Sequence, residues 1–259
     1  MQNHSKFIFL WLFLTQLVAC GNNEIPSYIL TDSQLHTYQG GDRLSYSVLS
    51  VSSTSDATGI LNLTFENADV LTPDNQTLAT FVRNQETLGN ISVNFATPYF
   101  TQTENADLIL QAYSEAGKTY WLAESQNAET GKTFYSSPLT DITEQVTISS
   151  QLLLCENTIC NNAGNTSVEL TPLGKETIET DYAKFETHKM FISWSVTLQN
   201  DDQSATLSTY NLTGTQWVFP PLGVVKFDYR LESTFTNDQL IGVLNATNIN
   251  IPSANKSEN

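Results

Sequence analysis

The sequence predicts an all-β protein, an antiparallel sandwich or an open barrel built as a single large domain. Three observations point to this class. Apolar and polar residues alternate with a period of two in several stretches, clusters of turn-forming residues separate these stretches, and no stretch shows a convincing helical spacing. Strands that are joined by short polar turns are typical of antiparallel sheets.

The first predicted strand follows the pair Gly40-Gly41. Leu44, Tyr46 and Val48 alternate there with arginine and serine, which indicates a strand with one buried and one exposed face. The same alternation returns in four later stretches, at residues 61–65, 91–95, 190–198 and 225–231. Polar clusters that contain Gly, Pro, Asn or Asp predict turns between them, at residues 72–75, 115–118, 161–164 and 200–202.

The stretch from Met190 to Leu198 is predicted to be the central strand. Its even-numbered side chains are all large and apolar, and an edge strand of this length would need protective charges. Trp194, in the middle of the stretch, is therefore predicted to lie in the core.

The chain is predicted to contain one folded domain. The sequence Ser136-Ser137-Pro138 is a candidate boundary, but the two halves that it separates show no repeat. We therefore expect four consecutive parts: a signal peptide, a tether, a β-rich domain and a polar tail, at residues 1–19, 20–37, 38–252 and 253–259.

The N-terminus resembles the signal peptide of a bacterial lipoprotein. Lys6 precedes an apolar run, and the run leads to Leu17-Val18-Ala19-Cys20, the pattern that the lipoprotein signal peptidase recognises. An uncleaved transmembrane helix is the alternative, but residues 7–19 fall short of the ~20 apolar residues that span a bilayer.

The resemblance implies that Cys20 becomes the first residue of the mature protein. Its sulfur and amine would be acylated, with palmitate as a typical acyl chain, and several acyl chains hold a protein on a membrane permanently. Gly21 follows where enteric bacteria place an Asp to retain a lipoprotein in the inner membrane, so we expect the outer membrane. The predicted membrane contact is the lipid on Cys20.

The mature chain is strongly acidic. Once the signal peptide with Lys6 is removed, 10 basic residues face 27 acidic ones, a formal charge of −17. This charge repels nucleic acid and anionic membrane surfaces and argues against both as partners of the folded domain.

Cys155 and Cys160 remain once Cys20 is assigned to the lipid. In an exported chain this pair is expected to form a disulfide. A metal site is the weaker alternative, because only His36 and His188 are available as further histidine ligands in the mature chain. The four-residue spacing between the cysteines also departs from the redox motif C-x-x-C.

Motifs for catalysis or cofactor binding are missing from the sequence. A catalytic triad would need His36, which lies in the predicted tether, or His188, which lies in a strand pattern. We therefore predict no catalytic residues, no cofactor and no metal, and expect that the protein is not an enzyme.

Parts of the mature chain resemble uncharacterised exported bacterial proteins and lipoproteins. The resemblance covers about a fifth of the chain and is carried by residues 41–46, 174–180, 185–190 and 216–226. It implies a β-rich envelope domain with a hairpin, a tryptophan strand, a Pro/Gly turn and a returning strand. It implies no activity. The family's Gly before the Phe is replaced here by Ala183-Lys184.

The tryptophan strand itself is interpreted structurally. Pro220-Pro221 cannot donate hydrogen bonds to a sheet and should end this strand, and Gly223 can adopt the positive φ that reverses the chain. Trp217 and Phe219 are expected to pack in the core or at an edge and not to form a ligand cage.

Two functions remain open. In the favoured one, the domain is a non-enzymatic interaction module that binds another envelope protein. The alternative is a carrier that holds an apolar ligand, such as an acyl chain, in a half-open barrel. Large apolar residues spread over many strands favour a filled core and hence the module.

Overall fold

The computed structural model describes residues 25–30, 34–52, 56–73, 77–91, 93, 95–123, 131–137, 139, 145–156, 159–199, 206–233, 237–252 and 256. The strands in these residues are β1 (Ser27–Tyr28), β2 (Arg43–Ser52), β3 (Asp56–Leu71), β4 (Thr77–Gly89), β5 (Thr97–Gln102), β6 (Leu108–Glu115), β7 (Lys118–Leu122), β8 (Lys132–Tyr135), β9 (Val146–Glu156), β10 (Ile159–Glu179), β11 (Lys184–Gln199), β12 (Thr206–Phe219), β13 (Gly223–Ser233) and β14 (Asn237–Thr247).

The sheet closes on itself. From β11 the hydrogen-bonded order runs through β10, β9, β7, β6, β5, β4, β3, β2, β14, β13 and β12, and β12 pairs with β11 again. Every pairing in this ring is antiparallel, while β1 and β8 lie outside the ring. The predicted class, a single antiparallel all-β domain, is confirmed, and the architecture is a closed barrel.

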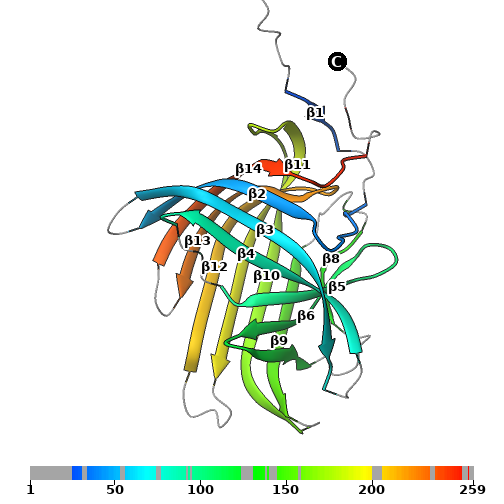
Figure 1. Cartoon of the computed structure of the whole chain (residues 1–259), viewed down its shortest axis with the longest axis vertical. Coiled ribbons are helices and arrows are strands. Elements are labelled where there is room, and N and C mark those ends of the chain that lie inside the picture. Colours follow the sequence, from blue (N-terminus) through cyan, green and yellow to red (C-terminus); the bar gives the residue numbers. More distant parts are fainter. Residues whose placement is uncertain are drawn as a thin grey trace, which may run out of the picture.

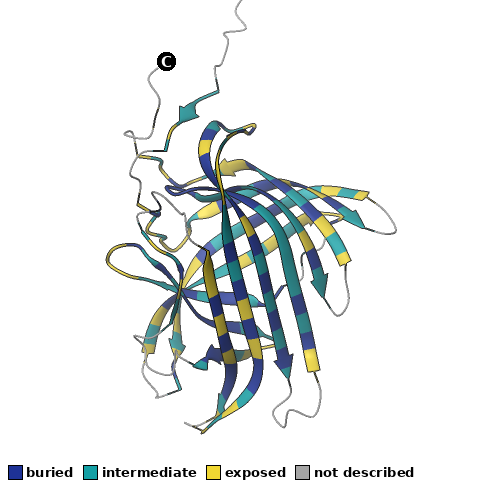
Figure 2. Cartoon of the chain, turned by 180° about the vertical axis from the view of Figure 1, so that it is seen from behind, coloured by how far each residue is buried: buried dark blue, intermediate teal, exposed yellow. Residues whose placement is uncertain are grey.

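The barrel has two broad walls. β2, β3 and β4 run across β10, β11 and β12 at a wide angle, so the two groups of strands face each other over the interior (Figure 1). Along the long strands buried and exposed residues alternate in bands (Figure 2). This alternation is what a period of two produces when one face of a sheet lines a core.

The predicted central strand, from Met190 to Leu198, forms most of β11. It pairs with β10 on one side and with β12 on the other. Its even-numbered side chains, from Met190 to Leu198, are at most 3% exposed. The prediction of a central strand with one buried face is therefore confirmed.

Trp194 stands at the centre of the core. Its ring lies 4.9 Å from the ring of Phe95 and 5.2 Å from that of Phe134, measured between centroids. Its Nε1 donates a hydrogen bond of 2.8 Å to Tyr113 Oη, which in turn contacts Thr166 Oγ1 at 2.8 Å. The buried polar atoms of this group are thus paired inside the apolar core.

The N-terminal segment lies against the barrel. β1 pairs in parallel with the start of β11, and the ring of Tyr28 stacks on Phe185 with 5.5 Å between centroids. Leu35 is only 8% exposed. Within the range 20–37, which the sequence assigns to a tether, the apolar side chains of Ile25, Tyr28, Leu30 and Leu35 therefore pack against the barrel, while Ile29 and Thr37 are exposed.

The predicted signal peptide, its recognition residues Leu17, Val18 and Ala19, and Cys20 lie outside the described residues. Of the predicted polar tail, Lys256 is described and forms a bridge with Tyr28. No helix among the described residues is both long enough and apolar enough to cross a membrane.

Candidate functional site

The barrel encloses a cavity of about 120 Å³ between its two walls. Most of its lining is apolar and comes from strands far apart in the sequence, for example Leu63 on β3, Trp194 on β11 and Leu212 on β12. Each of these side chains sits at the inward position of its strand. The cavity is therefore a product of the same alternation that builds the core.

A group of four tyrosines also lines the cavity; we call Tyr38, Tyr46, Tyr135 and Tyr229 the tyrosine cluster. Two of them are bound to the backbone near the β12–β13 turn. Tyr38 Oη donates to the carbonyl of Leu222 at 3.3 Å, and Tyr46 Oη donates to the carbonyl of Val224 at 2.7 Å.

Gln216 links the other two tyrosines. Tyr229 Oη donates to Gln216 Oε1 at 2.7 Å, and Gln216 Nε2 donates to Tyr135 Oη. Because the hydroxyl oxygen of Tyr135 accepts this bond, its own proton remains available for a further acceptor.

Burial raises the pKa of every tyrosine in the cluster far above the ordinary value of 10.0, while the positive charge of Arg83 acts in the opposite direction on all four. The effect of burial is the larger one. The cluster is therefore neutral at physiological pH, and its hydroxyl groups act as hydrogen-bond donors.

Arg83 is the cation at this site. It lies on β4 opposite Phe65 of β3, and both residues line the cavity. The residue is half-buried, and its Nε is buried without a hydrogen-bond partner. No ion pair joins Arg83 to a carboxylate of the described residues.

Two acidic residues near Arg83, Glu66 on β3 and Glu86 on β4, have partners elsewhere. Asn84 Nδ2 donates to Glu66 at 2.7 Å, and Asn62 Nδ2 lies 3.4 Å from Glu86. On these two strands the odd-numbered side chains of Phe65 and Arg83 face inward. The even-numbered side chains of Glu66, Asn84 and Glu86 are exposed. These carboxylates therefore lie on the outer face, whereas Arg83 belongs to the inner face.

Among the described residues, the backbone pairing of the wall is short beside Arg83. β4 pairs there with β3 along its whole length, but with β5 only at Phe81 and Val82. Arg83 and Gln85 lie directly beyond this short pairing and line the cavity together with Val93. Among the described strands of the ring, the β4–β5 seam is the shortest pairing, and Arg83 lies directly beside it.

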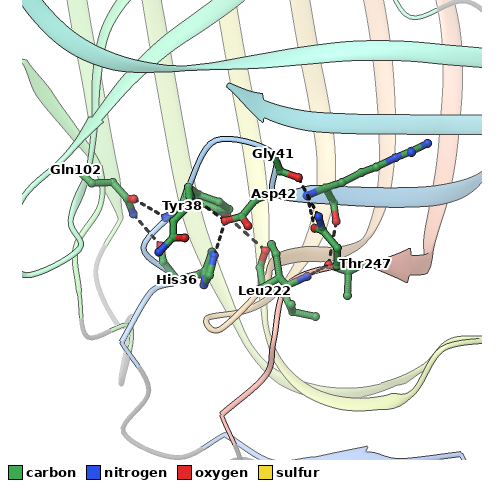
Figure 3. Close-up of polar contacts among 11 residues, drawn as sticks. His36, Tyr38, Gly41, Asp42, Gln102, Leu222 and Thr247 are labelled. Carbon is green, nitrogen blue, oxygen red and sulfur yellow. Dashed lines mark hydrogen bonds and ion pairs between the residues drawn. The ribbon is translucent and has the colours of Figure 1, made fainter. Parts of the chain in front are cut away.

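One end of the barrel is filled by residues 35–42, which we call the N-terminal plug. The side-chain amide of Gln102 holds it with two bonds of 2.8 Å, from Tyr38 N to Oε1 and from Nε2 to the carbonyl of His36 (Figure 3). His36 N also donates to the carbonyl of Pro220 at 3.0 Å. The plug leaves the ring of Tyr38 stacked on Phe65, with 3.9 Å between centroids.

The predicted disulfide is present. Cys155 and Cys160 are opposite each other at the end of the β9–β10 hairpin and are joined by an S–S bond. Neither lines the cavity. The bond therefore fastens a hairpin and does not contribute to the candidate site.

The two histidines of the mature chain lie in different elements, His36 in the N-terminal plug and His188 on β11. His36 Nε2 contacts Asp42 Oδ2 at 2.7 Å in the plug, and His188 is buried on β11 opposite Val218. The described residues contain no group of three His, Cys, Asp or Glu side chains that could hold a metal ion.

Trp217 and Phe219 pack as the sequence predicts. Phe219 is fully buried, and Trp217 is 7% exposed, with Lys226 Nζ 4.5 Å from its ring centroid and its Nε1 donating to Glu176 at 3.1 Å. β12 ends at Phe219, and β13 begins at Gly223, which has a φ of 94°. The predicted turn through Pro220-Pro221 is confirmed.

Sequence reasoning missed Arg83 and the tyrosine cluster. The one available signal was parity: Phe81, Arg83 and Gln85 share a face of β4. However, the stretch contains polar residues at both parities, so it has no clear apolar face that would have identified a strand.

No family model matches the chain, and no curated protein matches it. Three solved structures are similar at low scores. An exported protein with a YmcC-like fold from Bacteroides fragilis is 10% identical, with 83% of this chain and 99% of that chain covered and a TM-score of 0.33.

A lipoprotein from Parabacteroides distasonis is 9% identical, with 84% and 100% of the two chains covered and a TM-score of 0.31. The hypothetical lipoprotein YmcC from Escherichia coli is 12% identical, with 95% and 98% covered and a TM-score of 0.28. By these names the three are exported proteins or lipoproteins, and none of the names states an activity.

Proposed function

We propose that this protein is a lipid-anchored protein of the bacterial envelope that binds a small apolar ligand inside its barrel. The observation that carries the proposal is the cavity, which is lined mainly by apolar side chains from both walls. Pockets of this kind, with a few polar groups among apolar ones, are typical of small-molecule sites.

The size of the cavity limits the ligand. Its volume, about 120 Å³, is comparable to the ~150 Å³ of an engineered apolar cavity that takes up benzene. A ligand of about six carbon atoms, or a segment of a longer acyl chain, matches this volume. Because the N-terminal plug fills one end of the closed ring, the opposite end and the β4–β5 seam remain as routes for entry.

The membrane attachment in this proposal rests on the sequence. Leu17-Val18-Ala19-Cys20 and the short apolar run before it support acylation of Cys20, and Gly21 favours the outer membrane. The described chain then begins at Ile25, so only a few residues separate the proposed lipid from the packed part.

Ligand binding is the second of the two functions that the sequence leaves open. The favoured interaction module needs a surface, and the exposed large apolar side chains are spread singly over several strands, as on many monomeric proteins. The sequence argument favoured a filled core over a cavity, and the cavity moves our preference to the carrier.

The test uses a secreted form with residues 21–259, which includes every described residue. We expect titration with 1-hexanol to shift the NMR signals of methyl groups in the cavity. Leu212→Trp places a larger side chain into the cavity and should abolish these shifts. Leu207→Trp on the same strand is the matched control, because Leu207 is 46% exposed on the outer face.

Native mass spectrometry of the same protein from bacterial periplasm gives an independent measurement. A co-purifying lipid that Leu212→Trp removes supports the carrier. Unchanged hexanol shifts in Leu212→Trp, or the lack of any shift in the unmodified domain, overturns the proposal.

A further inference from the structure

We infer that the ligand in the cavity carries an oxyanion, a carboxylate or a phosphate, which binds Arg83 beside the tyrosine cluster. This inference rests on the proposed function and adds the chemical class of the ligand. It predicts an amphipathic molecule with a short apolar segment in the barrel and its anionic group at the β4–β5 seam.

The first argument is the charge of Arg83. A guanidinium remains protonated in proteins, and a half-buried cation is costly unless a counter-charge or full hydrogen bonding compensates for it. Among the described residues, Arg83 has no carboxylate partner and its Nε is buried without an acceptor. An anionic group in the cavity would supply both.

The charge distribution of the whole chain makes this position unusual. Acidic residues outnumber basic ones by 27 to 11, yet Glu66 on β3 and Glu86 on β4 lie on the outer face. If Arg83 served only to stabilise the fold, an inward carboxylate on one of these strands would be its natural partner. A ligand that brings its own negative charge accounts for the lack of an Asp or Glu among the described residues that line the cavity.

The second argument is the set of donors around Arg83. Its charge acts on the pKa of all four tyrosines, so the cluster lies within its electrostatic reach. Tyr135 accepts from Gln216 and keeps its own proton free to donate. The guanidinium of Arg83 and the free hydroxyl proton of Tyr135, which both line the apolar cavity, match the head group of a short amphiphile.

The location supports the same ligand. Arg83, Gln85 and Val93 line the cavity where β4 has passed the end of its pairing with β5. A head group at this seam stays close to solvent, which lowers the cost of desolvating its charge, while its chain extends between Leu63 and Leu212 into the interior.

The test compares three ligands with the same chain: hexanoate, hexyl phosphate and 1-hexanol. In the secreted form with residues 21–259, we expect at least one anion to bind more tightly than the alcohol. The expected factor is roughly 10 to 100, as for a hydrogen bond to a charged group. The tighter anion identifies the source as a fatty acid or a lipid phosphate.

The variant Arg83→Gln should abolish the preference for the anion over 1-hexanol. Arg230→Gln is the matched control: it removes one positive charge from the outside of β13, where Arg230 pairs with Glu232 at 2.8 Å. We expect Arg230→Gln to leave all three affinities unchanged, which separates a local contact from an effect of net charge.

The outcomes distinguish the two proposals. If 1-hexanol binds but neither anion binds more tightly, the oxyanion site is wrong and the apolar carrier stands. If none of the three binds, both proposals fail. If both variants weaken the anions equally, the effect is net charge and the assignment to Arg83 is overturned. The comparison within the unmodified protein holds even where a variant fails to fold.

Discussion

At the scale of single residues, parity on a strand decides what each side chain does. Trp194 and Phe191 lie three residues apart on β11, yet the exposed fraction is 3% for Trp194 and 36% for Phe191. The two residues differ in parity, so one faces the core and the other faces solvent. Substitutions on β11 should therefore have effects that follow parity.

Trp194→Ala is expected to lower the free energy of unfolding by roughly 3–5 kcal/mol, because it leaves a cavity in the core and removes the donor to Tyr113. Urea denaturation followed by circular dichroism measures the loss. Phe191→Ala is the control and should cost much less. A loss below about 1 kcal/mol for Trp194→Ala contradicts the central position of β11.

The tyrosine cluster predicts loss of stability at alkaline pH. The four pKa values are raised in the folded state, mainly by burial, from an ordinary value of 10.0. A group of this kind stabilises the fold fully below pH 10, and this contribution is lost as the pH rises through the folded-state pKa. We therefore expect the urea midpoint to fall steadily above pH 10.

Ultraviolet absorbance of tyrosinate gives the matching signal. Part of the tyrosinate absorbance increase should be absent while the protein is folded and should appear only when the protein unfolds. Complete titration of all 10 tyrosines near pH 10 in a protein that keeps its native dichroism would contradict the burial of the cluster.

At the scale of elements, β9 and β10 form a hairpin whose end carries the disulfide between Cys155 and Cys160. The loop that this bond closes is short, so its effect on the unfolded chain is modest. The hairpin is also held by the long pairing of β10 with β9 and with β11. The bond should therefore add stability without deciding the fold.

The double variant Cys155→Ser and Cys160→Ser is expected to fold and to lose about 2 kcal/mol of unfolding free energy. Thiol labelling of the denatured, unreduced domain should modify neither cysteine in the unmodified protein. Stoichiometric labelling of both would show that the bond is absent from the exported protein.

The elements also show how far the sequence could be interpreted. The strand from Met190 to Leu198 could be predicted because five apolar side chains in a row share one parity. β4 could not, because threonine, asparagine and glutamine obscure its two faces. Arg83 could not be predicted as a site residue for the same reason, since an inward arginine can be recognised only after its strand is known.

At the scale of the whole molecule, alternation predicted an all-β domain but could not predict which strands pair. The pairing of Leu44 on β2 with Thr247 on β14 closes one side of the ring, and no local pattern in either strand specifies the other. The cavity depends on both walls and was beyond reach for the same reason.

The proposed anchor makes a prediction about the whole chain. Cys20→Ala should block processing of the precursor and acylation, because the peptidase requires the cysteine. Radiolabelled palmitate should enter the unmodified protein and not the variant. Cys155→Ser, which also removes one cysteine, is the control and should be labelled normally. Equal labelling of Cys20→Ala would contradict the lipid anchor.

The pairing of β2 with β14 also sets an order of assembly. A chain that crosses a membrane from its N-terminus delivers β2 early and β14 last, so β2 waits without this neighbour until nearly the whole sequence has emerged. Contacts between such distant segments form slowly, and an unpaired strand edge invites association with other chains. The vulnerable period for this protein therefore lies between its arrival and the docking of its last strand, when a holding chaperone would have the most effect.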